Sequence, residues 1–292
     1  MQTWKDEVQR ESFVNNELLE KLLVETKGCS DAEFEAVMKR AENQARLTLE
    51  EVAILLNTED KAKIKRIFDL AKSIKERVYG NRVVLFAPLY VGNKCTNSCT
   101  YCGFKVSNHD TLRQTLTLDE VRAEVEALTD EGHKRLIMVY GTHPDYSPEY
   151  IASTVKEAYA FKKNNGEIRR VNINACPLSV EDYKPIKEAG IGTYQIFQES
   201  YHEETYKKMH VGGEKSNFKW RLFGLSRAME AGIDDVGIGA LFGLYKWKFE
   251  VLGLMSHVEH LETEYGVGPH TISFPRLKDA NGTSKDPEYV VG

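Results

Sequence analysis

Three of the five cysteines in this 292-residue chain lie within eight residues of one another. Cys95, Cys99 and Cys102 occur in the stretch NKCTNSCTYCGF, at spacings of four and three. Thiolates on one short loop can bind three corners of a cubane iron–sulfur cluster and leave one iron open to a small molecule. A closed structural zinc site takes four ligands instead. The loop therefore predicts a [4Fe-4S] cluster.

The zinc alternative needs a fourth ligand from outside the loop. His109, Cys29 or Cys176 would have to supply it, and the chain has no second CxxC pair. Five unevenly placed cysteines are too few for a disulfide framework, so a reducing cytoplasm and a metal or redox role are the better interpretation. Cys29 and Cys176 are interpreted as ordinary thiols.

Composition and charge favour some partners over others. The start of the chain, MQTWKDEVQR, lacks the apolar run of a signal peptide, and no stretch approaches the roughly 18–20 apolar residues of a membrane span. The formal net charge of −5 argues against nucleic acid, because proteins that bind phosphate backbones normally carry a basic surplus. We therefore expect a cytoplasmic protein whose partners include neither nucleic acid nor a membrane.

The first eighty residues differ from the rest of the chain. Apolar residues at helical spacing predict four helices there, over 15–26, 30–43, 47–57 and 61–80. After Gly80, short apolar runs predict six strands, over 82–91, 134–140, 168–175, 192–197, 234–242 and 270–275. Amphipathic stretches separate these strands and predict helices over 117–132, 148–163, 179–190, 218–232 and 248–266.

Strands that alternate with helices form a parallel sheet of βαβ units. We expect an α/β fold, a TIM-type (β/α) barrel with at least six parallel strands over 81–277. A helical extension over 1–80 precedes it and a polar tail over 278–292 follows it. Eight strands would need roughly 60 more residues, so the chain is either a partial barrel or a fragment. Ligand sites in such folds gather at the carboxyl ends of strands, where the cysteine loop follows the first strand.

The cysteine spacing, with Tyr101 just before the last cysteine, resembles the signature of radical S-adenosylmethionine (SAM) enzymes. The resemblance implies a [4Fe-4S] cluster on Cys95, Cys99 and Cys102, with SAM bound to the open iron through its amino and carboxylate groups. It also implies a low-potential electron donor, whose electron breaks a sulfonium–carbon bond and yields a 5′-deoxyadenosyl radical. The stretches VVLFAPLYVGNKCTNSCTYCGF, QIFQESYHEETY, GIGALFGL and SFPRL are together similar to the aromatic amino acid lyase branch.

That branch holds the thiamine-pathway tyrosine lyase, 2-iminoacetate synthase, and the tyrosine lyase of [FeFe]-hydrogenase maturation. The stretches 165–206 and 232–254 are more similar to the maturase. The resemblance implies cleavage of L-tyrosine at Cα–Cβ into p-cresol and dehydroglycine. For a maturase it also implies a supply of CO and cyanide and partners in hydrogenase maturation. A tryptophan lyase, a sulfur-inserting enzyme and a non-catalytic metal-binding scaffold remain as alternatives.

The chain departs from the family pattern in several places. It lacks the last barrel strands, the substrate-carboxylate arginine on a later strand, and the C-terminal CxxC of the maturase's second cluster, so no residues are assigned to these roles. Where the family often has Gly-Glu after the second strand, this chain has YGTHP. Gly141 and Thr142 are therefore assigned only backbone contacts to the SAM amine.

Two charged residues are assigned to SAM. Glu199 ends the fourth strand, where a carboxylate can bond a ribose hydroxyl or an ammonium group, and in the family this glutamate faces SAM. The alternative for Glu199 is a structural role at the N-terminus of the next helix, where the helix dipole favours a negative charge. Arg221 could bind the SAM carboxylate with both arms of its guanidinium. A surface ion pair is the alternative for Arg221.

The remaining candidates depend more strongly on the resemblance. Gly239 and Ala240, in GIGALFGL, are assigned to a close approach of backbone and adenine, although glycine repeats also serve packing. Asn172 and Asn174 share one face of the third strand and could contact SAM or substrate, or hydrogen-bond within a buried layer. Tyr101 is placed at the cofactor site with packing as its alternative. A structural role is favoured for His270.

Overall fold

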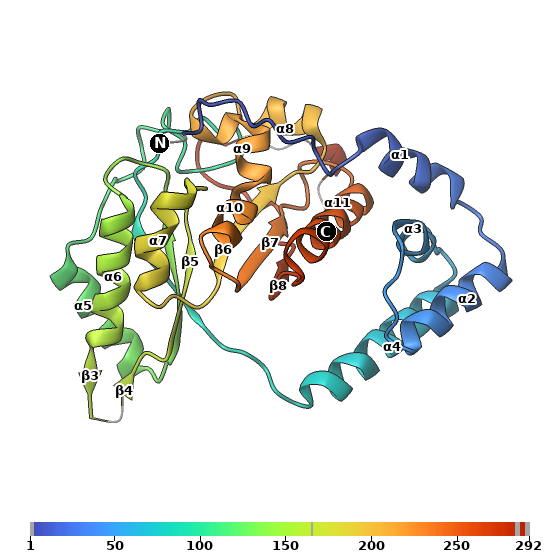
Figure 1. Ribbon diagram of the computed structural model, residues 1–292, viewed down its shortest axis with the longest axis horizontal. Coiled ribbons are helices and arrows are strands. Elements are labelled where there is room, and N and C mark those ends of the chain that lie inside the picture. Colours follow the sequence, from blue (N-terminus) through green and yellow to red (C-terminus); the bar gives the residue numbers. More distant parts are fainter. Residues whose placement is uncertain (1–2, 165, 284–286, 290–292) are drawn as a thin grey trace.

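The computed structural model describes residues 3–164, 166–283 and 287–289. Its centre is a six-stranded, wholly parallel sheet in the order β1-β2-β5-β6-β7-β8 (Figure 1). The order of the strands follows the chain, as it does in one arc of a barrel. The prediction of a partial TIM-type α/β barrel is confirmed. The strands are β1 (Ala87–Gly92), β2 (Arg135–Tyr140), β5 (Arg170–Asn174), β6 (Tyr194–Glu199), β7 (Val236–Ala240) and β8 (Thr271–Ser273).

Helices follow the strands and cover the outer face of the sheet (Figure 1). In β5, Val171 and Ile173 point to that face and are fully buried, whereas Asn172 and Asn174 point to the other face and are half-buried. This alternation seats the core between sheet and helices and places Asn172 and Asn174 on the concave face, in register with Ile137 and Val139 of β2. The covering helices are α5 (Leu118–Asp130), α6 (Pro148–Ala160), α7 (Val180–Glu188), α10 (Gly224–Glu230) and α11 (Trp247–Tyr265).

The structure differs from the sequence predictions in a few elements. The first strand begins at Ala87 instead of Arg82, because Val83–Phe86 forms an exposed link to the sheet. The helix predicted over 218–232 is broken at Phe223. The two parts of the broken helix are α9 (Phe218–Leu222) and α10. The sequence analysis did not predict the short helices α8 (Glu203–Met209) and η1 (Glu214–Ser216), or the hairpin of β3 (Lys162–Lys163) and β4 (Gly166–Glu167).

The four helices predicted before the sheet are present. Ser30 caps α2: its hydroxyl accepts from the backbone N–H of Glu33, and the Glu33 carboxylate accepts from the backbone N–H of Ser30. Helices α1 and α3 pack against α11, so this extension is joined to the barrel through them. The helices are α1 (Asn16–Glu25), α2 (Asp31–Glu42), α3 (Leu49–Leu56) and α4 (Lys61–Tyr79).

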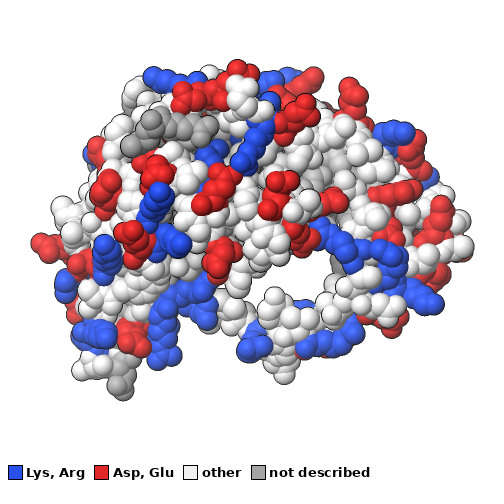
Figure 2. Space-filling view, viewed as in Figure 1, with Lys and Arg blue, Asp and Glu red and all other residues white. Residues whose placement is uncertain are grey.

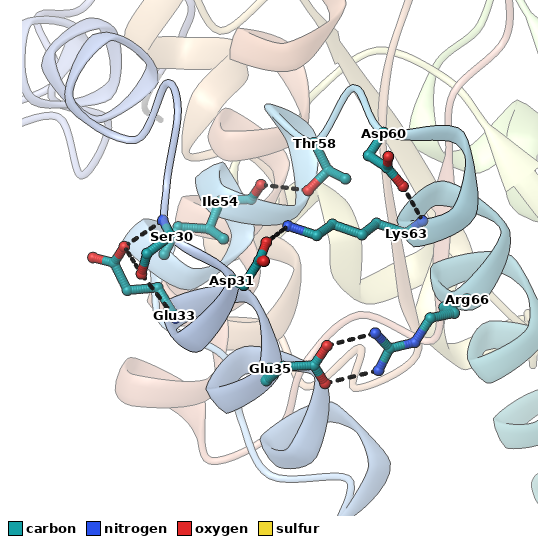
Figure 3. A network of polar contacts seen from close by, with 9 residues as sticks. All are labelled: Ser30, Asp31, Glu33, Glu35, Ile54, Thr58, Asp60, Lys63 and Arg66. Carbon is teal, nitrogen blue, oxygen red and sulfur yellow. Dashed lines mark hydrogen bonds and ion pairs between the residues drawn. The ribbon is translucent and has the colours of Figure 1, made fainter.

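Helix α4 lies beside α2 but stands away from the sheet and its covering helices, and the space-filling view shows an open gap beside it (Figures 1 and 2). None of its residues is buried. Polar contacts hold its first turns to α2: Lys63 Nζ lies 2.5 Å from Asp31 Oδ1, and Arg66 binds both carboxylate oxygens of Glu35 at 2.5 and 2.8 Å (Figure 3). Lys63 and Arg66 also lie over the ring of Phe34.

Across the described part of the chain, no helix has both the length and the apolar composition of a membrane span. Of the polar tail predicted over 278–292, residues 284–286 and 290–292 lie outside the described residues, and Pro287–Tyr289 forms the short helix η2.

Candidate cofactor site

The cysteine loop follows β1 at the carboxyl end of the sheet. Three backbone bonds fix it: Thr96 N–H donates to Thr142 O at 2.8 Å, Ser98 N–H to Gly212 O at 3.0 Å, and Thr100 N–H to Met209 O at 2.9 Å. The end of β2 and the segment after α8 thus hold the loop from two sides.

Arg113 holds the same loop through four backbone carbonyls. Its Nη1 donates to the carbonyls of Asn93 and Phe104 at 2.8 and 2.9 Å. Its Nη2 donates to those of Lys105 and Asn108 at 2.8 and 3.1 Å. Because these carbonyls lie on both sides of the three cysteines, the planar guanidinium fixes the two ends of the loop relative to each other.

The three thiols suit an iron–sulfur cluster. Cys99 is buried, Cys95 and Cys102 are half-buried, and all three are free thiols. Burial raises the pKa of Cys99 to about 11 and raises that of Cys102, so positive charge is needed to keep them as thiolates at neutral pH. Among the described residues no three ligand side chains converge on a single ion. A cubane does not need such convergence, because each of its thiolates binds a different iron.

Tyr101 is fixed by a buried histidine that the sequence analysis did not single out. Its hydroxyl lies 2.8 Å from His210 Nε2, and His210 Nδ1 lies 2.8 Å from the Tyr206 carbonyl. A carbonyl can only accept, so Nδ1 carries the proton and Nε2 accepts from Tyr101. Burial, together with the charge of Lys215, holds the pKa of His210 well below its usual range. The histidine is therefore neutral, so it accepts from the Tyr101 hydroxyl through Nε2 and donates to the Tyr206 carbonyl through Nδ1.

Glu199, Lys215 and Arg221 form a charged group at the end of β6. The Glu199 carboxylate accepts from Lys215 Nζ at 2.6 Å and lies 3.5 Å from Arg221 Nη2. Arg221 Nε donates to the Phe197 carbonyl at 2.6 Å. Both proposed alternatives are wrong: Glu199 ends a strand instead of beginning a helix, and the Arg221 side chain is only 8% exposed instead of lying at the surface.

Lys215 also connects this charged group to the cysteine loop. Its backbone N–H donates to Asn97 Oδ1 at 2.9 Å, and Asn97 lies between the first two cysteines and is buried. Gly213 has a φ of +83°, and a Cβ there would lie 2.4 Å from Asn97 Oδ1. The glycine is required for this close approach. The cysteines and the Glu199 group are thus parts of one site.

Gly141 and Thr142 lie beside the cysteine loop. Gly141 N–H donates to the Gly92 carbonyl at 2.9 Å, and a Cβ at Gly141 would lie 2.1 Å from the Lys94 carbonyl oxygen. The Thr142 carbonyl accepts from Thr96. These backbone groups brace the loop, and their contact with a SAM amine remains a prediction.

The other assigned residues are less directly placed. A Cβ at Gly239 would lie 2.5 Å from the Phe197 ring, so the space above this glycine is filled by that side chain. Ala240 is buried and pairs in register with Glu199. Asn172 Oδ1 accepts from the backbone N–H of Thr193 at 2.9 Å. This is a hydrogen bond within the protein, the alternative to a contact with SAM or substrate. Asn174 lies on the same concave face, nearer the carboxyl end of the strand.

The fold and the site together define a class of protein: a (β/α) barrel arc with three closely spaced thiols on the loop after its first strand. Residues 89–252 match the model of the Radical SAM superfamily, and the chain belongs to this superfamily. The family predicted from the cysteine motif is therefore confirmed.

Particular relatives agree with the predicted branch. The 2-iminoacetate synthases of Escherichia coli and Salmonella typhimurium are 31% and 33% identical to this chain, over 85% of it and 64% of their own length. The crystal structure of HydG, a maturase of the [FeFe]-hydrogenase, superposes with a TM-score of 0.93 at 46% identity and covers 96% of this chain. HydG from Carboxydothermus hydrogenoformans gives 0.83 at 39% identity over 93% of this chain.

The chain is shorter than these relatives. It spans 64% of either synthase and 62% and 63% of the two HydG chains. The shared part contains the sheet, its covering helices and the candidate cofactor site.

Proposed function

We propose that the chain is the cofactor-binding part of a radical SAM tyrosine lyase. The enzyme would cleave the Cα–Cβ bond of L-tyrosine to give p-cresol and dehydroglycine, that is, 2-iminoacetate. The observation that carries this proposal is the single site in which Lys215 joins the cysteine loop to the buried group of Glu199 and Arg221. Similarity to 2-iminoacetate synthases and to HydG supports the lyase reaction.

Each part of the site has a role in this proposal. Cys95, Cys99 and Cys102 would hold the [4Fe-4S] cluster, and Arg221 and Glu199 would bind the carboxylate and the ribose or ammonium group of SAM. The reduced cluster and SAM supply the 5′-deoxyadenosyl radical that starts the reaction, with an electron from a low-potential donor. The concave face of the sheet would orient the amino acid and exclude water, with Asn174 at its polar edge.

We favour a role in [FeFe]-hydrogenase maturation, with CO and cyanide as the further products and maturation proteins as partners. Its support is the 46% identity to HydG, compared with 31% and 33% for the synthases. The second candidate is the synthase itself, which those same relatives support. Five free cysteines suit the reducing cytoplasm where either enzyme would work.

Mass spectrometry tests the reaction. The full-length protein, reconstituted with iron and sulfide without oxygen, is given SAM, dithionite and L-tyrosine. We expect p-cresol and 5′-deoxyadenosine in the wild type and neither product in a Cys99→Ala variant. Deoxyadenosine without p-cresol would contradict the lyase assignment. Cyanide among the products favours the maturase, and 2-iminoacetate or its hydrolysis product glyoxylate without cyanide favours the synthase.

A further inference from the structure

A buried carboxylate lies directly behind the end of β6. Glu250, near the start of α11, is fully buried. Its Oε1 accepts from the Ser200 hydroxyl at 2.6 Å, and its Oε2 accepts from the backbone N–H of Tyr201 at 2.7 Å. Ser200 and Tyr201 are the two residues that follow Glu199, so Glu250 binds the chain just past the candidate SAM ligand.

The same face of α11 also receives the Tyr201 side chain. A Cβ at Gly253 would lie 2.4 Å from the Tyr201 Cβ, so only glycine leaves room for it there. The Tyr201 hydroxyl lies 2.9 Å from His257 Nδ1. Glu250, Gly253 and His257 are spaced three and four residues apart and therefore share one side of the helix. This side of α11 therefore contacts residues 200–201 through all three positions.

The backbone that this helix holds is in an uncommon conformation. Glu199 has a φ of +71°, in the left-handed region that residues other than glycine rarely adopt. The register of β6 against β7 shifts between Phe197 and Glu199. Such a conformation persists only where its surroundings hold it, and it sets the direction in which the Glu199 carboxylate points.

Simple packing does not account for a carboxylate at this position. Burial of an ionised or neutral carboxyl group is unfavourable unless hydrogen bonds compensate for the lost water, and an apolar side chain of similar size would fill the space without that cost. The two bonds from Ser200 and Tyr201 are what stabilise Glu250 there. The position of the carboxylate is therefore tied to the segment after Glu199.

We propose that Glu250 is a positioning residue for SAM. By holding Ser200 and Tyr201 it fixes the left-handed backbone of Glu199 and directs that carboxylate toward Lys215 and Arg221. The inference rests on the proposed function, because it takes the Glu199 group to be the place where SAM binds. It assigns to a helix on the outer face of the sheet a role in the affinity for the nucleotide.

The test compares variants of the cluster-loaded chain. SAM affinity is followed through the electron paramagnetic resonance (EPR) signal of the reduced cluster, and iron and sulfide contents are measured in parallel. We expect Glu250→Leu to bind SAM about tenfold more weakly at unchanged cluster content, because Tyr201 N–H and Ser200 lose their partner. Glu250→Gln should stay near the wild type, since an amide oxygen can accept from Tyr201 and its NH2 can donate to Ser200. Amide exchange at residues 199–201 should be faster in Glu250→Leu.

Ser256→Ala is the matched control, because Ser256 is buried on the same helix and, among the described residues, its hydroxyl bonds only the Leu252 carbonyl within that helix. It should leave SAM affinity unchanged. A folded Glu250→Leu variant with wild-type affinity overturns the inference. Should that variant not fold, Ser200→Ala removes one of the two bonds and must still weaken SAM binding, or the inference is wrong. A wild-type chain that holds the cluster but binds no SAM overturns the proposed function and this inference together.

Discussion

The ion pair of Glu199 and Lys215 concentrates charge at a nearly buried position. The two side chains are only 12% and 15% exposed, and their atoms lie 2.6 Å apart. Removal of Lys215 takes away the shorter of two contacts that compensate the Glu199 carboxylate and leaves the 3.5 Å contact with Arg221. We expect Lys215→Met to lower the free energy of unfolding by about 2 kcal/mol, measured by urea denaturation of the cluster-free chain.

The double variant Lys215→Met with Glu199→Gln provides the control for that prediction. It also removes the carboxylate that lies 3.5 Å from the buried Arg221, so it should be less stable than the single variant. A double variant that is more stable than Lys215→Met would mean that Arg221 does not compensate the Glu199 carboxylate.

Glu250 makes stability depend on pH. Burial raises its pKa from 4.5 to about 8. Between these values the folded chain binds more protons than the unfolded chain, so this contribution is fully present below pH 4.5 and is lost as the pH rises through 8. Relative to Glu250→Gln, which does not titrate, the wild type should lose on the order of a few kcal/mol between pH 5 and pH 8.5. Urea denaturation across that range measures the difference, and a constant difference would contradict the prediction.

At the scale of elements, Arg113 connects the two ends of the cysteine loop. Lysine has one ammonium group and cannot reach four carbonyls in the plane that the guanidinium serves. We expect Arg113→Lys to lose cluster iron to a chelator at least about tenfold faster than the wild type, because a loosened loop presents its thiolates less precisely. Arg122→Lys, which alters an ion pair with Glu157 outside the site, is the control. Equal rates in all three proteins would show that Arg113 does not hold the loop.

No residue of helix α4 is fully buried: Ile64, Ile67, Leu70 and Ile74 are half-buried, and the ion pairs of Figure 3 add to this shallow contact. Lys63 is 24% exposed and Asp31 is 89% exposed, so salt should screen their attraction. We expect amide exchange in α4 to accelerate several-fold between about 0.05 and 1 M NaCl, while α11 is unaffected. Unchanged exchange in α4 would mean that its contacts with α2 are not electrostatic.

Most of these elements could be predicted from the sequence, because periodicity reports which side chains are buried. The four N-terminal helices and the six strands follow directly from it. The break at Phe223 could not be predicted, since the apolar pattern continues through it. Val83–Phe86 is as apolar as a strand yet exposed, so composition alone assigned it to the sheet.

At the scale of the whole molecule, the site is assembled at one edge of the sheet from distant segments. The cysteines and Glu199 could be located because the motif follows one strand and Glu199 ends another, whereas Arg221 lies on α9 and was singled out by its guanidinium group. Lys215 and His210 could not, because they lie in a polar segment whose only signal is a pair of glycines. Their importance depends on the contact of that segment with the cysteine loop, which no local pattern encodes.

The central claim is that the cluster on Cys95, Cys99 and Cys102 keeps one iron open and that SAM binds it. The direct measurement is EPR spectroscopy of the cluster-loaded chain, reduced with dithionite, before and after SAM is added. We predict a [4Fe-4S] signal that changes shape and position with SAM in the wild type. A cluster signal that SAM leaves unchanged, or a chain that binds one zinc ion and no cluster, would contradict the account.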